Sequence, residues 1–312
     1  MNHNSTSKRI ILAGGSGFLG RELAAHLESR GGYEPVILTR NPDGYEGAGR
    51  AVFWDGKTLE NELRTEIERA AAIINLAGKN VNCRPSEKNR EEILTSRTDS
   101  VRVLGEAVRN VNEPPPVWIQ ASSLAIYGDA GDAICDESAR VDEGFPANVC
   151  TAWEEELGKA ILPNIRWAAL RIGFVLGKDD GALPFLAKLV KLGLGGSIGN
   201  GKQWISWIHL DDMIAQLVEA LENPAISGIY NATGPNPVTN ADLMTTLRRI
   251  LNRPWSPPAP AFAVRIGAPI LDSDPEIALT GRRCIPKRLT EAGFEFRHPD
   301  LESALRDILK TH

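Results

Sequence analysis

The sequence predicts an α/β fold, a doubly wound parallel sheet followed by a smaller C-terminal domain that covers the substrate side of the sheet. Six short apolar runs have the length and composition of buried strands, and segments with apolar residues at helical spacing lie between them. Strands that alternate with helices form parallel sheets with helices on both faces, which is the doubly wound arrangement. The expected strands are residues 9–13, 36–38, 51–54, 72–75, 117–121 and 167–172.

The helices expected between these strands follow from the same spacing. Leucines recur every four residues after the first strand, and a longer apolar series precedes the fifth. A further helix is expected to open within NVCTAWEEEL, residues 148–157. The apolar positions that predict the first two helices are Leu19, Leu23 and Leu27, and then Val101, Leu104, Val108 and Val111.

The character of the chain changes after residue 180, where the glycine-rich stretch GLGGSIGNG predicts a flexible loop. A helix is expected at 211–222, and Thr239 followed by Asp242 is a capping-box pattern that predicts the start of another. The chain therefore divides into a first domain at 8–180 and a second at 181–312, with parts of 205–235 returning to the first sheet. The last helix is expected after a proline-rich connector, around Leu301, Leu305 and Ile308.

Composition and charge limit the function classes. The 312 residues are 42% hydrophobic and 24% charged, with 35 basic and 40 acidic side chains and a net charge of −5. This balance is ordinary for a soluble globular protein and lacks the basic blocks of a nucleic-acid or anionic-membrane binder. No apolar run approaches the roughly 18–20 residues that a membrane span needs. We therefore expect a small-molecule ligand, without nucleic acid or membrane partners.

The cysteines indicate a compartment and argue against a metal. Cys83, Cys135, Cys150 and Cys284 stand far apart, without the spacing of a metal site. The first residues, MNHNSTSK, lack the apolar core of a signal peptide and are expected to be a frayed terminus. Together these features predict a reducing, cytoplasmic location and no metal ligand set.

A glycine loop follows the first expected strand, in IILAGGSGFLGREL at residues 10–23. Its glycines fit both GxxGxxG and GxGxxG, and the loop opens the first amphipathic helix. Glycines at such a turn let the backbone approach a pyrophosphate, and the helix N-terminus offers free N–H groups. A purely structural turn is the alternative. The loop predicts dinucleotide contacts from Gly14, Gly15, Ser16, Gly17, Phe18, Leu19 and Gly20.

The second strand ends in VILTRN, which bears on the choice of cofactor. An acidic residue at this point binds the ribose 2′-hydroxyl of NAD. Here the position holds Thr39 and Arg40, about 20 residues beyond the last glycine, the expected spacing. Because a guanidinium pairs well with a 2′-phosphate, NADP(H) is favoured over NAD(H). The alternative is that Arg40 is an ordinary solvated arginine.

Three further motifs carry a family resemblance. INLAG at 74–78, ASSLAIYGD at 121–129 and WIHLDD at 207–212 follow the glycine loop in order. Together they resemble the extended or atypical short-chain dehydrogenase/reductase (SDR) superfamily, whose nucleotide domain is a Rossmann fold. The stretch at 281–305 is similar to that of an NAD-dependent epimerase/dehydratase-like subgroup. That subgroup includes nucleoside-diphosphate-sugar-epimerase-like and cell-division-inhibitor-like proteins with a C-terminal segment of the DUF1731 type.

The resemblance implies further cofactor contacts. Residues after the fourth and fifth strands would line the cofactor, Asp55 would lie at the adenine side, and two residues after the sixth strand would meet the nicotinamide. Apart from Asp55, the residues implied in this way are Leu76, Ala77, Gly78, Ser122, Phe174 and Val175.

The resemblance also exposes a departure at the active site. Typical members carry a tyrosine as acid/base and a lysine four residues on, and the matching positions here hold Val149 and Trp153. Ser123 matches the residue that orients the substrate oxygen, although its hydroxyl could simply satisfy its own loop. Tyr127 is a candidate substitute acid, and a pocket wall is its preferred interpretation.

Other reactive side chains have plain structural interpretations. Cys150 is expected to be a small buried apolar group, although a helix N-terminus can lower a thiol pKa. His209 is expected to make a structural contact at the start of the 211–222 helix. Lys79 and Arg84 form a small basic cluster that could face an anionic substrate or the cofactor, and a solvated loop is the default.

Two functions remain open. The first is an NADP(H)-dependent atypical oxidoreductase or epimerase-like enzyme acting on a small carbonyl or hydroxyl substrate. The second is a non-catalytic NADP(H)-sensing binding protein; a structural protein with a vestigial fold is a weaker third. The resemblance also implies a possible homodimer through the helices at 86–110 and from 149.

Overall fold

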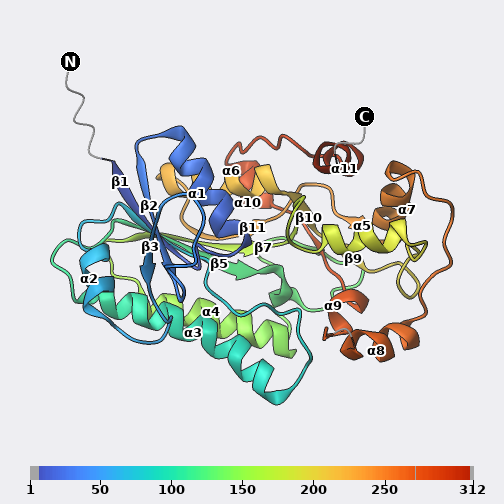
Figure 1. Cartoon of the computed structure of the whole chain (residues 1–312), viewed down its shortest axis with the longest axis horizontal. Helices are drawn as coiled ribbons and strands as arrows, with labels where there is room; N and C mark the ends of the chain where they lie inside the picture. Colours follow the sequence, from blue (N-terminus) through green and yellow to red (C-terminus); the bar gives the residue numbers. More distant parts are fainter. Residues whose placement is uncertain (1–6, 271, 310–312) are drawn as a thin grey trace.

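A seven-stranded parallel sheet forms the centre of the molecule (Figure 1). The computed structural model describes residues 7–270 and 272–309, so residues 1–6 of the expected frayed terminus lie outside the described residues, whereas Lys8, its last residue, begins β1. The strand order is β3-β2-β1-β4-β5-β7-β11, and the predicted α/β doubly wound class is confirmed. The strands are β1 Lys8–Ala13, β2 Tyr33–Thr39, β3 Arg50–Phe53, β4 Ala72–Asn75, β5 Val117–Ser123, β7 Arg166–Ile172 and β11 Gly228–Ala232.

Helices cover both faces of this sheet, as the apolar spacing predicts. On one face lie α1 (Phe18–Arg30) and α6 (Leu210–Glu222), whose buried leucines and isoleucines pack on the strands. On the other lie α2 (Asn61–Ile67), α3 (Glu87–Arg109) and α4 (Phe145–Ala160), as Figure 1 shows. Burying both faces explains why the strands are continuous apolar runs rather than alternating ones.

The expected strands are all present, with two local differences from the sequence prediction. Strand β11, with the sequence GIYNA, pairs with β7 and adds a strand to the six expected ones. Its buried Asn231 interrupts the apolar run by which buried strands were predicted. Helix α4 begins at Phe145, earlier than the expected opening at 148–157. Pro146 occupies its first turn, where a missing N–H costs nothing.

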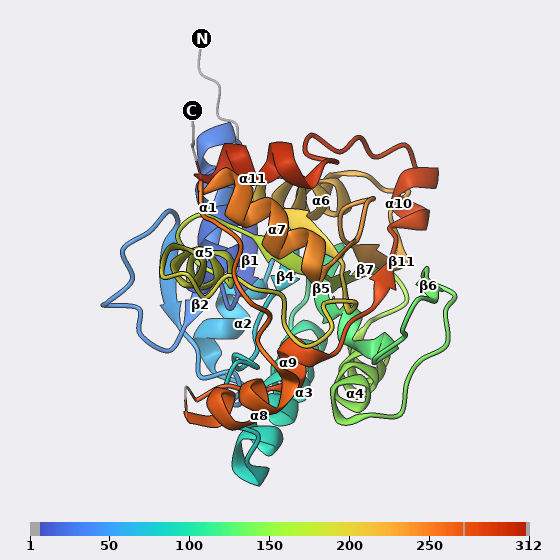
Figure 2. The same ribbon diagram turned by 90° about the vertical axis from the view of Figure 1, so that its right-hand side faces the viewer.

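The C-terminal region has a core of its own beyond the end of the sheet, formed mainly by α5 (Leu183–Lys191), α7 (Asn240–Ile250) and α11 (Leu301–Leu309) (Figures 1 and 2). The capping box at Thr239 and Asp242 is present, and Leu301, Leu305 and Ile308 are buried as expected. Its elements include α5 Leu183–Lys191, β8 Phe174–Leu176, β9 Trp204–Ile205, β10 Trp207–His209, β12 Val238–Thr239, α7 Asn240–Ile250, α8 Ala261–Ile270, α9 Glu276–Leu279 and α11 Leu301–Leu309.

Two contacts tie the last segment to the rest of the chain. The buried carboxylate of Asp212 on α6 accepts the backbone N–H groups of Arg297 (2.8 Å) and His298 (2.9 Å). Strand β13 (Arg283–Cys284) pairs with β6 (Ile134–Cys135), and α10 (Lys287–Glu291) follows it. The C-terminal segment therefore closes over the strand ends, while the predicted division near residue 180 stays a prediction. In the described residues, no helix is long and apolar enough to cross a membrane.

Candidate functional site

A cleft of about 750 Å³ opens at the carboxyl ends of β1, β2, β3 and β4. Such an edge is where parallel α/β sheets bind their ligands. The glycine loop, the ends of three strands and the first half of α3 line it. Of the residues predicted to bind the cofactor, those in the lining are Gly14, Ser16, Gly17, Thr39, Arg40, Asp55, Leu76, Ala77 and Gly78.

The glycine loop is shaped by close approaches that no other residue permits. Gly14 has a φ of +74°, and a Cβ there would lie 2.8 Å from the Cα of Ala77. A Cβ on Gly20 would lie 2.5 Å from the Cα of Gly15, so these two glycines bring α1 against the loop. Gly17 is the N-cap residue of α1, and it has no side chain that could accept a hydrogen bond from the first N–H groups of the helix. The first N–H groups of α1 are therefore left for a ligand.

The end of β2 presents a cation to the cleft. Arg40 is exposed in the lining, and within the described chain no carboxylate pairs with it. Thr39, beside it, is buried and donates its hydroxyl to the Oγ of Ser16 at 3.1 Å. That bond fixes the end of β2 to the glycine loop, so the Arg40 backbone has a defined position.

Asp55 turns its carboxylate into its own loop. One oxygen accepts the N–H groups of Lys57 (2.7 Å) and Thr58 (2.8 Å), and the other accepts the Thr58 hydroxyl (2.8 Å). Burial raises its pKa, but these hydrogen bonds outweigh it and hold the pKa below its usual value. Asp55 is therefore charged and lies in the cleft at the β3 side.

Seven predicted cofactor residues lie outside the lining of this cleft. Gly15 and Gly20 pack against each other, as described above, and Phe18 lies against Gly177 in the loop after β8. Ser122 is buried. Leu19 packs on the core, while Phe174 and Val175 begin β8 and pair with β10.

A buried polar network lies beside α4, where the sequence predicted the active site. Arg171 on β7 forms two 2.8 Å bonds to the carboxylate of Glu154. Ser122 donates its hydroxyl to the same carboxylate at 2.6 Å. Val149 and Trp153 on α4 are both 5% exposed. The two positions of interest are thus closely packed. Ser122, Glu154 and Arg171 hydrogen-bond to one another, whereas the buried Nε1 of Trp153 has no hydrogen-bond partner among the described residues.

Tyr127 belongs to this network. Its hydroxyl accepts a hydrogen bond from Arg171 Nη1 and donates one to Asn231 Oδ1, both at 2.8 Å. Burial raises its pKa to about 12, even though Arg171 opposes that shift. These bonds favour the pocket-wall interpretation of Tyr127. Ser123 is half-buried, and its Oγ accepts the N–H of Ala125 at 3.2 Å, a contact within its own loop.

The remaining reactive side chains have structural partners. Cys150 is 3% exposed, and burial raises its thiol pKa to about 11, as expected for a buried apolar group. Lys79 lies in the cleft and contacts Glu92 at 2.5 Å. Arg84 approaches Asp272 at 3.5 Å. The two predicted basic residues are therefore separately paired.

The sequence analysis missed the contribution of α3 to the cleft. Glu92, Thr95, Ser96 and Ser100 line it, and Ser96 accepts the N–H of Lys79 at 2.9 Å. The sequence prediction of α3 rested only on its apolar positions. The polar residues next to the loop after β4 were the signal that could have shown that this helix lines the cleft.

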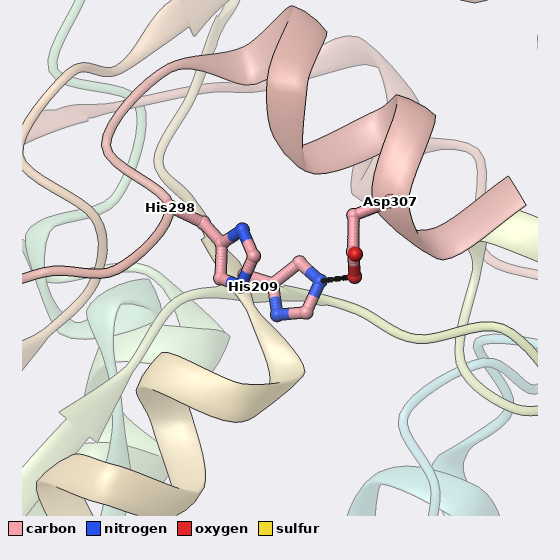
Figure 3. Close-up of side chains that lie close together, drawn as sticks. All are labelled: His209, His298 and Asp307. Carbon is pink, nitrogen blue, oxygen red and sulfur yellow. Dashed lines mark ion pairs between the residues drawn. The ribbon is translucent and has the colours of Figure 1, made fainter. Parts of the chain in front are cut away.

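His209, His298 and Asp307 lie together between α6 and α11 (Figure 3). His209 Nδ1 accepts the N–H of Asp211 at 3.0 Å and caps α6, which confirms its expected structural contact. A neutral imidazole that accepts at Nδ1 carries its proton on Nε2, the atom 3.4 Å from Asp307. The two rings stack with centroids 3.8 Å apart, and one ligand atom from each of the three side chains lies within 4.8 Å of the others. This geometry favours a packing contact over a metal site.

Comparison with known proteins identifies the family. The model of the NAD dependent epimerase/dehydratase family matches residues 10–233, more than half of the chain. The chain belongs to the NAD-dependent epimerase/dehydratase family. A second model, the domain of unknown function DUF1731, matches residues 259–308. The predicted resemblance is therefore confirmed in both parts.

Relatives resemble the chain along almost all of its length. Epimerase family protein YfhF of Bacillus subtilis is 36% identical over 304 residues, covering 96% of this chain and 97% of the relative. The chloroplastic SDR39U1 homolog of Arabidopsis thaliana is 34% identical over 310 residues, covering 96% and 86%. A crystal structure of human epimerase family protein SDR39U1 with NADPH has a TM-score of 0.85 and 31% identity, covering 97% of this chain and all of that one.

The glycine loop and the cleft at the carboxyl edge of the sheet are formed in this chain. Val149 and Trp153, which the sequence analysis predicts to stand at the family's tyrosine and lysine positions, are buried and provide neither an acid nor a cation. The site is therefore suited to hold a dinucleotide, and its chemistry has to use other groups.

Proposed function

We propose that this chain binds NADP(H) and acts as an atypical oxidoreductase or epimerase-like enzyme on a small carbonyl or hydroxyl substrate. The observation that carries the proposal is Arg40, an exposed guanidinium at the cleft without a carboxylate partner among the described residues. A planar guanidinium matches the oxygens of a 2′-phosphate and has no such partner in NAD(H). The NADPH in the human SDR39U1 structure supports the same choice.

The rest of the cleft fits such a cofactor. The uncapped N-terminus of α1 would hold the pyrophosphate, and Gly14 lets the loop run next to Ala77 at the end of β4. Lys79, although paired with Glu92, adds positive charge to the same cleft. When bound, the nicotinamide would supply the hydride donor or acceptor.

The substrate would lie beyond β4, near Ser123 and under the C-terminal segment. Ser123 is half-buried at the end of β5, so its hydroxyl can donate to a substrate oxygen while accepting from Ala125. The proton would come from Tyr127, an ordered water or the substrate itself. All four cysteines are free, which supports a reducing compartment such as the cytoplasm.

A second function, NADP(H) sensing without turnover, is favoured by one observation. The acid/base and cation positions are filled by the buried Val149 and Trp153, and the Tyr127 hydroxyl is held by two partners. A site without a free acid would bind the nucleotide and change only the C-terminal surface. In this case the chain would still bind NADP(H) but would catalyse no reaction.

The cofactor proposal is tested by titrating the purified protein with NADPH while following nicotinamide fluorescence. Replacing Arg40 with aspartate removes the guanidinium and adds a charge that repels the 2′-phosphate. We expect NADPH to bind about 100-fold more weakly, because charge-assisted hydrogen bonds contribute about 1.5–3 kcal/mol. The matched control is Arg64→Asp, an exposed arginine on α2 outside the cleft lining. Unchanged binding in Arg40→Asp would disprove the assignment.

Enzyme and sensor are then separated by turnover. Wild-type protein is incubated with NADPH and a panel of aldehydes, ketones and keto acids, with Arg40→Asp as the background. Oxidation of NADPH that disappears in the variant supports the enzyme. Tight binding without oxidation, together with slower hydrogen exchange at 192–207 and 281–305 when NADPH is bound, supports the sensor.

A further inference from the structure

Arg97 on α3 occupies an unusual place beside Trp153. Its guanidinium carbon lies 5.1 Å from the centre of the Trp153 ring, over its face. Its Nη1 donates to the backbone oxygens of Ile93 (2.9 Å) and Lys79 (3.1 Å). A Cβ on Gly78 would lie 3.2 Å from the same guanidinium carbon. The cation is thus held between the end of β4 and α4.

The charge of Arg97 is not balanced by protein. Within residues 7–270 and 272–309, no carboxylate lies at ion-pair distance from it, and its Nε and Nη2 donate no hydrogen bond to protein. The neighbouring Arg171, by contrast, has two bonds to Glu154. Arg97 is half-buried, and this burial lowers its pKa. Its Nε and Nη2 are not buried, so they are accessible to a ligand, and a charged donor forms strong hydrogen bonds to ligand oxygens.

The position of Arg97 relative to the cleft suggests the ligand. Its neighbours Gly78, Lys79 and Ser96 line the cleft, at the β4 end of the strand row. Arg40 and Asp55 lie at the other end, on β2 and β3. A dinucleotide with its 2′-phosphate at Arg40 and its pyrophosphate at α1 would continue along this edge toward β4. Its second ribose would arrive at Arg97.

We propose that Arg97 binds the nicotinamide-side ribose of the cofactor, and that Trp153 is the platform that holds its guanidinium in place. This inference rests on the proposed NADP(H) function. The free Nε–H and Nη2–H groups of Arg97 suit the ribose hydroxyl oxygens, and the tryptophan face stabilises the cation. The family resemblance implies a lysine at position 153, which here is a tryptophan. In this proposal Arg97, on α3, supplies the positive charge instead.

The test compares two ligands that share one half. NADPH has both halves, whereas adenosine 2′,5′-bisphosphate carries the 2′-phosphate and lacks the nicotinamide half. In Arg97→Met, we expect NADPH to bind at least about tenfold more weakly, the loss of one charge-assisted contact. Binding of the bisphosphate should stay within about twofold of wild type, a difference near measurement error. Arg109→Met, an exposed arginine at the other end of α3, is the control.

Further variants separate charge from packing. Arg97→Lys keeps the charge, so it should bind NADPH more tightly than Arg97→Met. Trp153→Leu removes the platform, so it should weaken NADPH less than Arg97→Met does and leave bisphosphate binding unchanged. Trp153→Phe keeps an aromatic face for the guanidinium and is the matched control for Trp153→Leu. Calorimetric titration measures all of these without turnover.

The results that overturn the inference differ from those that overturn the proposed function. If Arg97→Met binds NADPH as wild type does while Arg40→Asp loses it, the cofactor proposal stands and the ribose contact is wrong. The contact is also wrong if Arg97→Met loses both ligands equally, or if Arg97→Lys is no better than Arg97→Met. If wild-type protein binds neither ligand, the proposed function itself fails.

Discussion

At the scale of single residues, the polar groups near α4 divide into satisfied and unsatisfied ones. Tyr127, Arg171, Glu154 and Asn231 hydrogen-bond to each other and are buried or nearly so. Arg40 lines the cleft and has no carboxylate partner among the described residues, and Arg97, whose neighbours Gly78, Lys79 and Ser96 line the cleft, donates to protein only through Nη1. Satisfied groups contribute to stability, whereas unsatisfied cations indicate where an anionic or hydroxyl-rich ligand binds.

This division predicts the effect of Tyr127→Phe. Removing the hydroxyl leaves the Asn231 carbonyl and one Arg171 donor without their partner, so we expect about 1–3 kcal/mol of lost stability. NADPH affinity should not change. Urea unfolding measures the first and titration the second, with Tyr45→Phe as a more exposed control. Unchanged stability would contradict the network.

At the scale of elements, we expect the stability of the junction between α6 and α11 to depend on pH. His209 is 3% exposed; burial lowers its pKa, and His298 lowers it further against the opposing carboxylates of Asp211, Asp307 and Asp212. The unfolded chain, with a histidine pKa of about 6.5, therefore takes up the proton first as the pH falls. Stability from this group is complete above about pH 6.5 and is lost as the pH falls below it.

The matched variant for this prediction is His209→Asn. Asparagine is also a good helix N-cap, so it keeps the cap of α6 and removes only the titrating ring. We expect the melting temperature of wild type to fall more steeply than that of the variant between about pH 7 and about pH 5. Parallel pH profiles would show that His209 does not titrate in this way.

The sequence predicts those elements that local pattern determines. Buried parallel strands are apolar runs, so six of them were found, and the Thr239 capping box was recognised from two residues. Strand β11 lies in the 205–235 stretch that was expected to return to the sheet, but its bounds were not predicted because Asn231, which hydrogen-bonds to a distant tyrosine, interrupts the apolar run. That bond spans 104 residues, and no local pattern encodes such a contact.

In the candidate site, too, the features carried by local sequence patterns were predictable and the long-range contacts were not. The glycine loop and Arg40 are local signals, and both lie in the cleft. Arg97 was not predicted as a site residue because the apolar series that predicts α3 begins only at Val101. Arg97 lies one turn before Val101 on the same helical face, and a charge on a buried face is the signal that could have revealed it. Its partner Trp153 is 56 residues away, so the pairing itself required the structure.

At the scale of the whole molecule, a Rossmann-like α/β domain is joined to a C-terminal region that closes over the strand ends. Asp212 and the β6–β13 pair hold that region in place. The cleft proposed to hold the nucleotide lies on the β1–β4 side of the sheet, and the predicted active-site positions Val149 and Trp153 lie on α4. Under the proposed function, cofactor choice and chemistry would therefore be carried by different parts of the molecule and can be tested separately.

The central claim is that the cleft selects NADP(H) through Arg40. The most direct test is the ratio of the dissociation constants for NADH and NADPH, measured on wild type and on Arg40→Asp. We expect wild type to prefer NADPH by at least about tenfold, which corresponds to about 1.4 kcal/mol. In the variant the preference should vanish or reverse. Equal affinity for the two nucleotides in wild type, or an unchanged preference in the variant, would contradict the claim.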